Sequence, residues 1–422
     1  MKRRSALRLL CTGGLAGLGG CIGQLSGNPR TTPRPLTDTF SNSEPPYWHH
    51  SLTGSGSLAA AESLFVLSRH TVDAEENEFR STLTQFASDG SEGWSQEIDA
   101  NTGNFRARSD TVFLFRSGEY PTIPSRVRAT DSTTGDVRWD QPVTTYLTFV
   151  GATDNAVFVG ATSDDPSRGP IEALDAASGD LLWQTETPMP TNGVISHGLC
   201  LVEGHPDTVI ALDTATGDKR WQKSPGELDQ MTVIGDTLVV FSDDGTTAYS
   251  LPGGEQRWQK DDRVECFVVS EGVSERGVTL YAGEGDGTVS AIDPETGDVR
   301  WATPFNTETS QGVRGIAHGG DTVVVRMWDT VSGLTATDGT ERWRQALTPV
   351  ERMDGPAIID RTVFVLHAST DDEFTVKTFD LDSGRKQWRF QHEWGDNLLP
   401  EAIVYDGQFI VAPIGGVYGF SP

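Results

Sequence analysis

Adjacent histidines and two short runs of aspartate and glycine are the residues here whose types and spacing suggest chemistry. His49 and His50 could share a metal ion only if both imidazoles faced one side, but neighbouring residues of a strand point to opposite faces. Asp243-Asp244-Gly245 and Gly285-Asp286-Gly287 resemble fragments of a calcium loop. Each lacks the later bidentate glutamate of such a loop and suits a hairpin turn equally well. No phosphate-binding glycine loop or Gly-x-Ser-x-Gly nucleophile elbow is present, so we expect no catalytic, metal-binding or cofactor-binding residues.

One pattern recurs along the chain after residue 46. Its full form is Ala-x-Asp-x-x-Thr/Ser-Gly-x-x-x-Trp, as in residues 129–139 and 173–183, and copies at 87–94 and 336–343 lack three residues of the turn. Successive tryptophans lie 37 to 46 residues apart, a period typical of a propeller or a solenoid. The tryptophans are Trp48, Trp94, Trp139, Trp183, Trp221, Trp258, Trp301, Trp343 and Trp388, and the turn aspartates are Asp131, Asp175, Asp213, Asp293 and Asp380.

Each copy predicts two strands joined by a tight turn. The aspartate accepts backbone N–H groups of the turn, and the glycine adopts the positive φ that such a turn requires. The tryptophan of the returning strand is large and flat, so it is expected to pack between neighbouring sheets. Two more strand-like runs precede each copy, for example residues 237–241 and 321–325. Four strands per unit is the blade of a β-propeller, and the predicted fold class is therefore all-β.

Counting these units predicts nine blades, with eight as the alternative. The C-terminal residues 401–422 contain three strand-like runs and no tryptophan strand. Residues 47–50 supply a strand of that kind, because Trp48 precedes Trp94 by one period. We expect this N-terminal strand to pair with the last blade, which would close the ring and remove an exposed sheet edge.

The repeated motif closely resembles the tryptophan-docking motif of the PQQ-like repeat family. That family includes quinoprotein dehydrogenases and non-enzymatic propellers of the BamB type, and eight blades are usual in it. Its dehydrogenases carry a pair of neighbouring cysteines beneath pyrroloquinoline quinone (PQQ), calcium ligands and an aspartate base. The cysteines of this chain are Cys11, Cys21, Cys200 and Cys266, so no neighbouring pair exists. The resemblance therefore implies the fold more strongly than it implies PQQ or calcium.

The N-terminus resembles an export signal that ends in a lipid attachment site. Residues 1–20 combine a basic start, a short apolar run and small residues, and Arg3-Arg4 is similar to a twin-arginine signal. Leu18-Gly19-Gly20-Cys21 is similar to a lipobox, in which Cys21 becomes the lipidated first residue of the mature chain. Residues 21–46 are rich in threonine, proline and serine and predict a flexible tether. The propeller is expected over residues 47–422.

The charge balance restricts the class of partner. The chain has 60 acidic residues against 33 lysines and arginines, a net charge of −27. Such a surface repels phosphate backbones and argues against nucleic-acid binding. Its acidity resembles that of proteins from halophilic archaea. Cys200 and Cys266 are predicted to be small buried residues within strands rather than a disulfide.

We expect a binding role rather than catalysis, because the repeats account for the whole mature domain. The predicted function is that of a lipid-anchored platform on the extracytoplasmic face of the cell membrane, a monomeric propeller that binds an unidentified protein. Binding of a solute or polysaccharide in the channel and PQQ-dependent oxidoreduction are the alternatives. Variable loops on a rigid scaffold often carry binding sites. The loops expected to do so cover residues 70–78, 117–126, 162–170, 271–277 and 368–373.

Overall fold

The computed structural model describes most of the chain after residue 45. The described ranges are 46–52, 55–73, 78–98, 102–116, 118, 124–143, 147–161, 167–270, 277–305, 312–347, 352–368, 373–393, 400–414 and 416–422. The predicted signal, Cys21 and nearly all of the tether lie outside these residues, as do large parts of the five predicted binding loops. Within the described ranges, no helix has the length and apolar character needed to cross a membrane.

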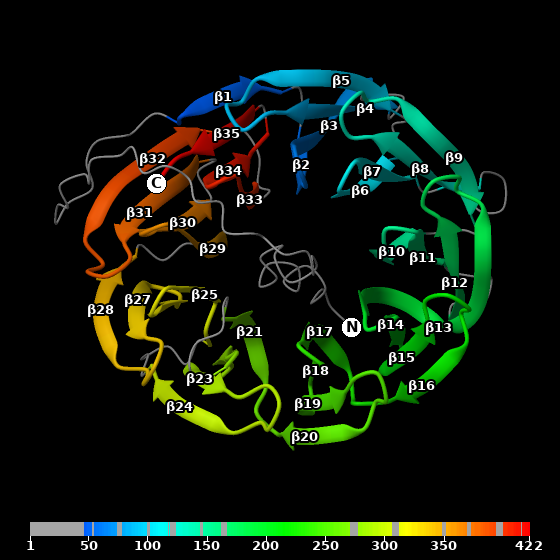
Figure 1. The fold of residues 1–422 in the computed structure, drawn as a ribbon. Helices are drawn as coiled ribbons and strands as arrows, with labels where there is room; N and C mark the ends of the chain where they lie inside the picture. The colour runs from blue at the N-terminus through cyan, green and yellow to red at the C-terminus, as the bar shows by residue number, and fades with distance from the viewer. Residues whose placement is uncertain are drawn as a thin grey trace. The chain divides into compact units, whose positions relative to one another are not determined.

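The chain divides into two compact units. The N-terminal unit comprises His50–Asp261 with Ile414–Val417, and the C-terminal unit comprises Met1–His49, Asp262–Pro413 and Tyr418–Pro422. Every regular element in the described ranges is a β-strand, and strands that follow one another in a sheet pair antiparallel (Figure 1). This confirms the predicted all-β class and the four-stranded antiparallel sheets.

The N-terminal unit contains three four-stranded sheets and one seven-stranded sheet. The four-stranded sheets are β2 (Ser55–Ala60), β3 (Leu64–Asp73), β4 (Glu78–Phe86), β5 (Glu92–Ile98); β6 (Thr102–Arg108), β7 (Thr111–Arg116), β8 (Ser125–Asp131), β9 (Val137–Val143); and β17 (Leu228–Ile234), β18 (Thr237–Ser242), β19 (Gly245–Ser250), β20 (Gln256–Lys260). The seven-stranded sheet is β10 (Leu147–Ala152), β11 (Ala156–Ala161), β12 (Arg168–Asp175), β13 (Leu181–Ser196), β14 (Leu199–His205), β15 (Thr208–Asp213), β16 (Lys219–Lys223). It consists of two four-stranded meanders that share β13, because this 16-residue strand pairs with β12 through its first part and with β14 through its second.

The C-terminal unit repeats the same meander. Its sheets are β21 (Val264–Val269), β22 (Leu280–Glu284), β23 (Thr288–Ile292), β24 (Val299–Pro304); β25 (Gly315–Gly319), β26 (Thr322–Arg326), β27 (Thr330–Thr335), β28 (Glu341–Ala346); and β29 (Arg352–Ile359), β30 (Thr362–Ala368), β31 (Glu373–Asp380), β32 (Lys386–Glu393). A last sheet joins both ends of the chain in the order β1 (Trp48–Ser51), β35 (Gly416–Phe420), β34 (Gln408–Ala412), β33 (Glu401–Tyr405). The backbone N–H of Tyr47 donates to the carbonyl of Gly419 at 2.8 Å. The number of blades and the closure of a ring stay predictions.

The repeated motif occupies the last two strands of each meander, as its sequence predicts. The small residue and the tryptophan stand opposite each other in the pairs Ala129↔Trp139 and Ala211↔Trp221. A register shift follows directly after both pairs. The small residue leaves room beside the large indole, and the bulge bends the strand into the turn.

The prediction of a shortened turn before Trp343 is wrong. Gly333 stands opposite Trp343, and the N–H of Gly339 donates to the carbonyl of Thr335. The repeat is therefore complete, with glycine and threonine replacing the usual alanine and aspartate. The copy before Trp94 is shorter by one residue rather than the predicted three, because the paired residues Phe86 and Glu92 are six positions apart, whereas the corresponding Thr130 and Val137 are seven apart.

Apolar side chains between successive sheets form the core of each unit. In the N-terminal unit, Phe65 and Leu83 pack against Leu114 of the following sheet. In the C-terminal unit, Val365 packs against Trp343 of the preceding sheet. Each such cluster removes two sheet faces from water at once, which is what stabilises a stack of small sheets.

Both cysteines of the described residues are buried as predicted, and the adjacent histidines contact different neighbours. Cys200 and Cys266 are free and fully buried. His49 stacks on Tyr418, whereas His50 lies edge-on to Phe86. Nε2 of His50 is also 3.4 Å from Oε2 of Glu92. In the described residues, no group of three or more histidine, cysteine or acidic side chains could hold a metal ion.

The two aspartate-glycine runs are hairpin turns. Ser242 pairs with Gly245, so Asp243 and Asp244 form the tip of the hairpin between β18 and β19. Asp286 accepts the backbone N–H of Thr288 at 2.8 Å in the turn between β22 and β23. All three aspartates thus lie in hairpin turns, where this residue type is common.

Candidate binding site

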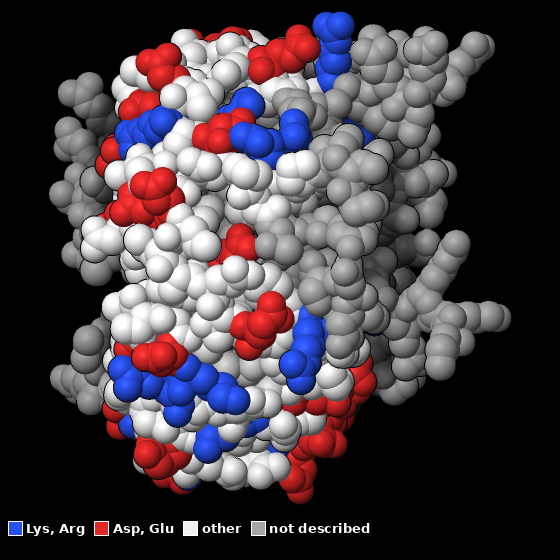
Figure 2. Space-filling model, turned by 90° about the vertical axis from the view of Figure 1, so that its right-hand side faces the viewer, with Lys and Arg blue, Asp and Glu red and all other residues white. Residues whose placement is uncertain are grey.

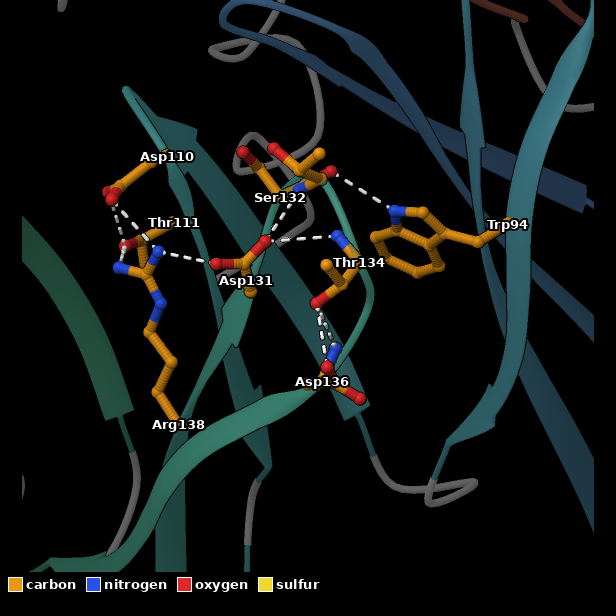
Figure 3. A network of polar contacts seen from close by, with 9 residues as sticks. Trp94, Asp110, Thr111, Asp131, Ser132, Thr134, Asp136 and Arg138 are labelled. Carbon is orange, nitrogen blue, oxygen red and sulfur yellow. Dashed lines mark hydrogen bonds and ion pairs between the residues drawn. The ribbon is translucent and has the colours of Figure 1, made fainter.

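The turn aspartates bind backbone and arginine together. One carboxylate oxygen of Asp131 accepts the backbone N–H groups of Thr133 and Thr134, both at 2.9 Å (Figure 3). The other accepts from Nη2 of Arg138 at 2.6 Å, and the same guanidinium donates to Asp110 at 2.8 Å. These bonds, that from Arg138 first, lower the pKa of Asp131 to about 2. The turn is thus held by a carboxylate that is charged at every physiological pH.

The other turn aspartates repeat the bond to the backbone, and two of them also repeat the bond to an arginine. Each accepts the backbone N–H of the residue three positions on, in the pairs Asp175–Ser178, Asp213–Thr216, Asp293–Thr296 and Asp380–Ser383. Arg220 and Arg300 donate to Asp213 and Asp293 as Arg138 does to Asp131. The residue before the tryptophan is therefore an arginine that pairs with the turn in these three repeats.

Six of the indoles donate a hydrogen bond to the turn of the following repeat. Nε1 of Trp94 donates to the carbonyl of Ser132 at 3.0 Å (Figure 3). A Cβ on Gly135, which has a φ of 79°, would lie 3.0 Å from that ring, so the turn requires glycine for its backbone and for its contact. The same bond joins Trp139–Ala176, Trp183–Thr214, Trp221–Pro252, Trp301–Ala336 and Trp343–Leu381.

Two of the remaining three tryptophans have other surroundings. Trp48 donates to the side-chain oxygen of Gln408 at 2.8 Å instead of a backbone carbonyl. Trp388 stacks on Phe420 with ring centroids 5.8 Å apart and lies 3% exposed. Trp258 is buried opposite Ala248. The predicted aspartates and tryptophans thus lie in the turns and strands of the sheets.

A surface cavity lies where β9 faces β12 and β13. It has a volume of about 450 Å³, and its lining residues are Gln141, Pro142, Val143, Glu172, Leu174, Gly179, Asp180 and Leu181. This size is within the range of small-ligand and side-chain pockets. The polar groups on its lining are two carboxylates and one amide, which suit a cationic or hydrogen-bond-donating guest.

Leu181 lines this cavity, and Leu182, which does not line it, is its neighbour in the chain. They are 55% and 51% exposed, in a described surface with only three other exposed large apolar residues, namely Tyr47, Val137 and Val299. Leu182 occupies the position before the tryptophan, where Arg138, Arg220 and Arg300 pair with their turn aspartates. Leucine at this position removes an ion pair and exposes apolar surface to water. Neither change stabilises the folded state. Exposed apolar residues beside a cavity are typical of a binding surface.

Charge around this surface is mixed but mainly acidic. Figure 2 shows acidic and basic side chains lying next to one another on the face that it draws. Glu186, which stands opposite Pro170, faces the same side of the sheet as Glu172, and Arg168 lies further along β12 on that side. Of these charged residues, Glu172 lines the cavity together with Asp180 of the turn, whereas Glu186 and Arg168 lie further along the same face. The chain as a whole carries a net charge of −27.

Glu203 is a buried acid elsewhere in the N-terminal unit. It lies on β14, 7% exposed, and its Oε1 has no hydrogen-bond partner in the described residues. Burial, with a smaller contribution from Asp229, raises the pKa of Glu203 to about 7, although a hydrogen bond from Asn192 opposes the shift. The folded protein therefore holds a proton on Glu203 that the unfolded chain releases near pH 4.5.

The raised pKa of Glu203 predicts a loss of stability with rising pH. Between about pH 4.5 and pH 7 the folded state binds the proton more tightly, so stability falls as pH rises, by about 3 kcal/mol in total. Glu203→Gln should be as stable as the native protein at pH 4.5 and more stable at pH 8. Urea unfolding of both proteins from pH 4.5 to pH 8 measures this difference, and parallel curves would contradict it.

Comparison with known families decides the relationship. The model of the PQQ-like repeat family described as "Outer membrane protein assembly factor BamB" matches residues 46–198, 167–315 and 285–422. The chain belongs to this family. BamB of Burkholderia pseudomallei is 25% identical over 56% of this chain and 64% of its own length, and BamB of Yersinia pestis is 20% identical over 78% and 88%. The chain thus spans just under two thirds of the Burkholderia protein.

A solved BamB structure has the same fold. The crystal structure of BamB from Moraxella catarrhalis covers 76% of this chain and 94% of its own, with a TM-score of 0.53 and 17% identity. The chain is accordingly a β-propeller of the BamB type. The predicted relationship to the PQQ-like repeat family and the predicted fold class are confirmed.

The structure adds a surface that the sequence interpretation overlooked. The predicted binding loops lie mainly outside the described residues, whereas the cavity by Leu181 lies beside a turn of the repeated motif. A signal existed in the sequence, because Leu181-Leu182 departs from the polar residues found at Lys219-Arg220 in the next repeat. This difference affects one turn among many similar ones. It becomes noticeable only in the structure, where the two leucines are exposed.

Proposed function

We propose that this BamB-family protein is a non-enzymatic lipoprotein that binds a protein partner at the surface formed by Leu181, Leu182 and the adjoining cavity. Leu182 carries the proposal, since it stands where three other repeats place a paired arginine. The names of the relatives, which describe a factor in outer membrane protein assembly, support a protein-binding role. Cys21 would hold the platform at the extracytoplasmic face of the membrane.

The cavity favours a partner segment of defined chemistry. Pro142, Val143, Leu174 and Leu181 offer an apolar lining for one aliphatic or aromatic side chain. Glu172 and Asp180 border the same space and would attract lysine or arginine on either side of that anchor. The expected partner therefore presents an apolar residue flanked by basic residues in an extended segment.

The family resemblance to quinoproteins does not extend to a cofactor site. The dehydrogenases seat PQQ on neighbouring cysteines, and the cysteines of this chain are far apart in sequence. Cys200 is fully buried, and burial raises the pKa of its thiol. The residues present thus do not fit PQQ in the manner of those enzymes.

Exchange of Leu181-Leu182 for Lys-Arg tests the proposed surface. The exchange copies the Lys219-Arg220 sequence of the next repeat, so it should preserve folding and give Asp175 the arginine partner that Asp213 has. We expect at least a tenfold loss of partner recovery when the tagged protein is purified from crosslinked native membranes. The loss follows from removal of apolar contact and the addition of charge that repels a basic segment.

Val299→Lys provides the matched control for this exchange. Val299 is 46% exposed at the position equivalent to Leu181 in another repeat, so its replacement adds one of the two positive charges of the exchange without touching the cavity. Its partner recovery should equal that of the native protein. Unchanged recovery for the Leu181-Leu182 variant would refute this surface, and recovery of no specific protein by any variant would refute the scaffold function.

A further inference from the structure

Three arginines gather on one face of the sheet β6–β9 in the N-terminal unit. Arg116 and Arg126 stand directly opposite each other on β7 and β8, and Arg128 lies two residues further along β8 on the same face. Like charges placed opposite each other destabilise a sheet. In a chain with a net charge of −27, such a cluster is unexpected unless a negative group binds there.

Asp140 orients two of these guanidinium groups. Its Oδ1 accepts Nε of Arg126 at 2.6 Å, and its Oδ2 accepts Nε and Nη2 of Arg128 at 2.9 and 2.8 Å. Arg126 also donates Nη2 to the carbonyl of Asp140 at 2.8 Å. Burial disfavours the charged carboxyl, but the bonds from Arg126 and Arg128 outweigh it and lower the pKa of Asp140.

Donor groups remain after Asp140 is satisfied. A guanidinium carries five N–H donors, and Arg126 and Arg128 each use two of them on this residue. The rest have no partner in the described part of the chain. Both side chains are only about one third exposed, at 30% and 29%, so their donors are directed by packing rather than free in solvent.

A small cavity lies within this cluster. Its volume is about 20 Å³, and its lining residues are Thr102, Leu114, Arg116, Arg126, Arg128 and Asp140. A cavity of roughly 10–15 Å³ accommodates one water-sized particle, so a polyatomic phosphate or sulfate would not fit. Thr102, which is 4% exposed and stands opposite Arg116, adds a hydroxyl to the lining. The guanidinium groups of Arg126 and Arg128 and the single carboxylate of Asp140 leave an excess of positive charge among these three side chains.

We propose that this cavity is a chloride site that joins β6, β7, β8 and β9. The ion would accept N–H groups from Arg126 and Arg128 and offset the repulsion between these two guanidinium groups. It would thereby stabilise one end of the sheet face on which Leu114, two residues from Arg116, packs against β3 and β4. The site is independent of the proposed partner surface, because it shares none of the residues that line the cavity beside Leu181.

Chloride-35 nuclear magnetic resonance measures such binding directly. The native protein should broaden the chloride signal, and Arg126→Gln/Arg128→Gln should lower that excess linewidth at least twofold. The control is Arg257→Gln/Arg342→Gln, which removes the same charge from arginines paired with Asp236 and Asp321. It should leave the excess linewidth nearly equal to that of the native protein. This result would distinguish chloride binding at the proposed site from a general effect of removing positive charge.

Crystals grown in sodium bromide provide a second measurement on the native protein. An anomalous peak within hydrogen-bond distance of Arg126 and Arg128 is expected, and an empty cavity in that map would overturn the proposal. If the double variant does not fold, Arg126→Lys keeps the charge but loses the directed donors and should still reduce the broadening. Equal broadening by folded native and variant proteins would also overturn it.

Discussion

Replacement of Trp343 by alanine is expected to lower the free energy of unfolding by about 3–5 kcal/mol, the range for deletion of a buried aromatic side chain. The indole is 7% exposed and packs in a cluster with Val365 and Phe379. Its Nε1 donates to the carbonyl of Leu381 at 2.9 Å, a buried bond between two sheets. Alanine would leave both a cavity and an unsatisfied carbonyl.

Chemical denaturation of the purified domain measures this loss. Trp343→Phe is the matched control, because it keeps much of the apolar volume and removes the N–H donor, so a smaller loss of about 1–3 kcal/mol is expected. Trp221→Ala should also cost less than Trp343→Ala, since Trp221 is only half-buried although it donates to Pro252 at 2.7 Å. A loss below about 1 kcal/mol for Trp343→Ala would show that the indole does not join the sheets.

Replacement of Cys21 by serine is expected to move nearly all of the protein from the membrane fraction to the soluble fraction. The prediction follows from Leu18-Gly19-Gly20-Cys21, in which the thiol is the attachment point for lipid. An acyl anchor gains about 0.8 kcal/mol for each buried CH₂ group, and serine cannot carry the same thioether. The globular part would then lack its proposed attachment.

Fractionation of intact cells and immunoblotting of membrane and medium measure the release. Cys11→Ser is the matched control, because Cys11 lies within the predicted signal and should be removed with it. That variant should stay with the membrane like the native protein. Persistence of the Cys21→Ser protein in washed membranes would contradict the lipid anchor while leaving the protein-binding proposal open to its own test.

The fold could be predicted from the sequence because each repeated turn is held together by residues that are close to one another in the chain. The turn around Asp131 depends on residues within eight positions of one another, since Asp131 binds Thr133, Thr134 and Arg138. Such a turn forms from its own residues, so its pattern repeats wherever the strands repeat. Gly135 carries the positive φ that the turn requires, and its presence in most copies makes the period visible. The four-stranded sheets and the family relationship follow from that period.

The candidate sites depend on contacts that no local pattern records. The sequence shows Leu182 and Glu203 as ordinary members of strands, yet the first is 51% exposed and the second 7%. Burial of Glu203 and its raised pKa come from the packing of β14 between other strands, including β17, which carries Asp229.

What the sequence determined is the repeat, and with it the strands, turns and family of this protein. The tertiary structure decided which residues the sheets leave exposed and which they bring together. Arg116 and Arg126 meet only because β7 and β8 pair in one register, and Asp140 reaches Arg126 and Arg128 from β9. The physical reason is that turn geometry is set by neighbours in sequence, whereas burial and electrostatics are set by neighbours in space.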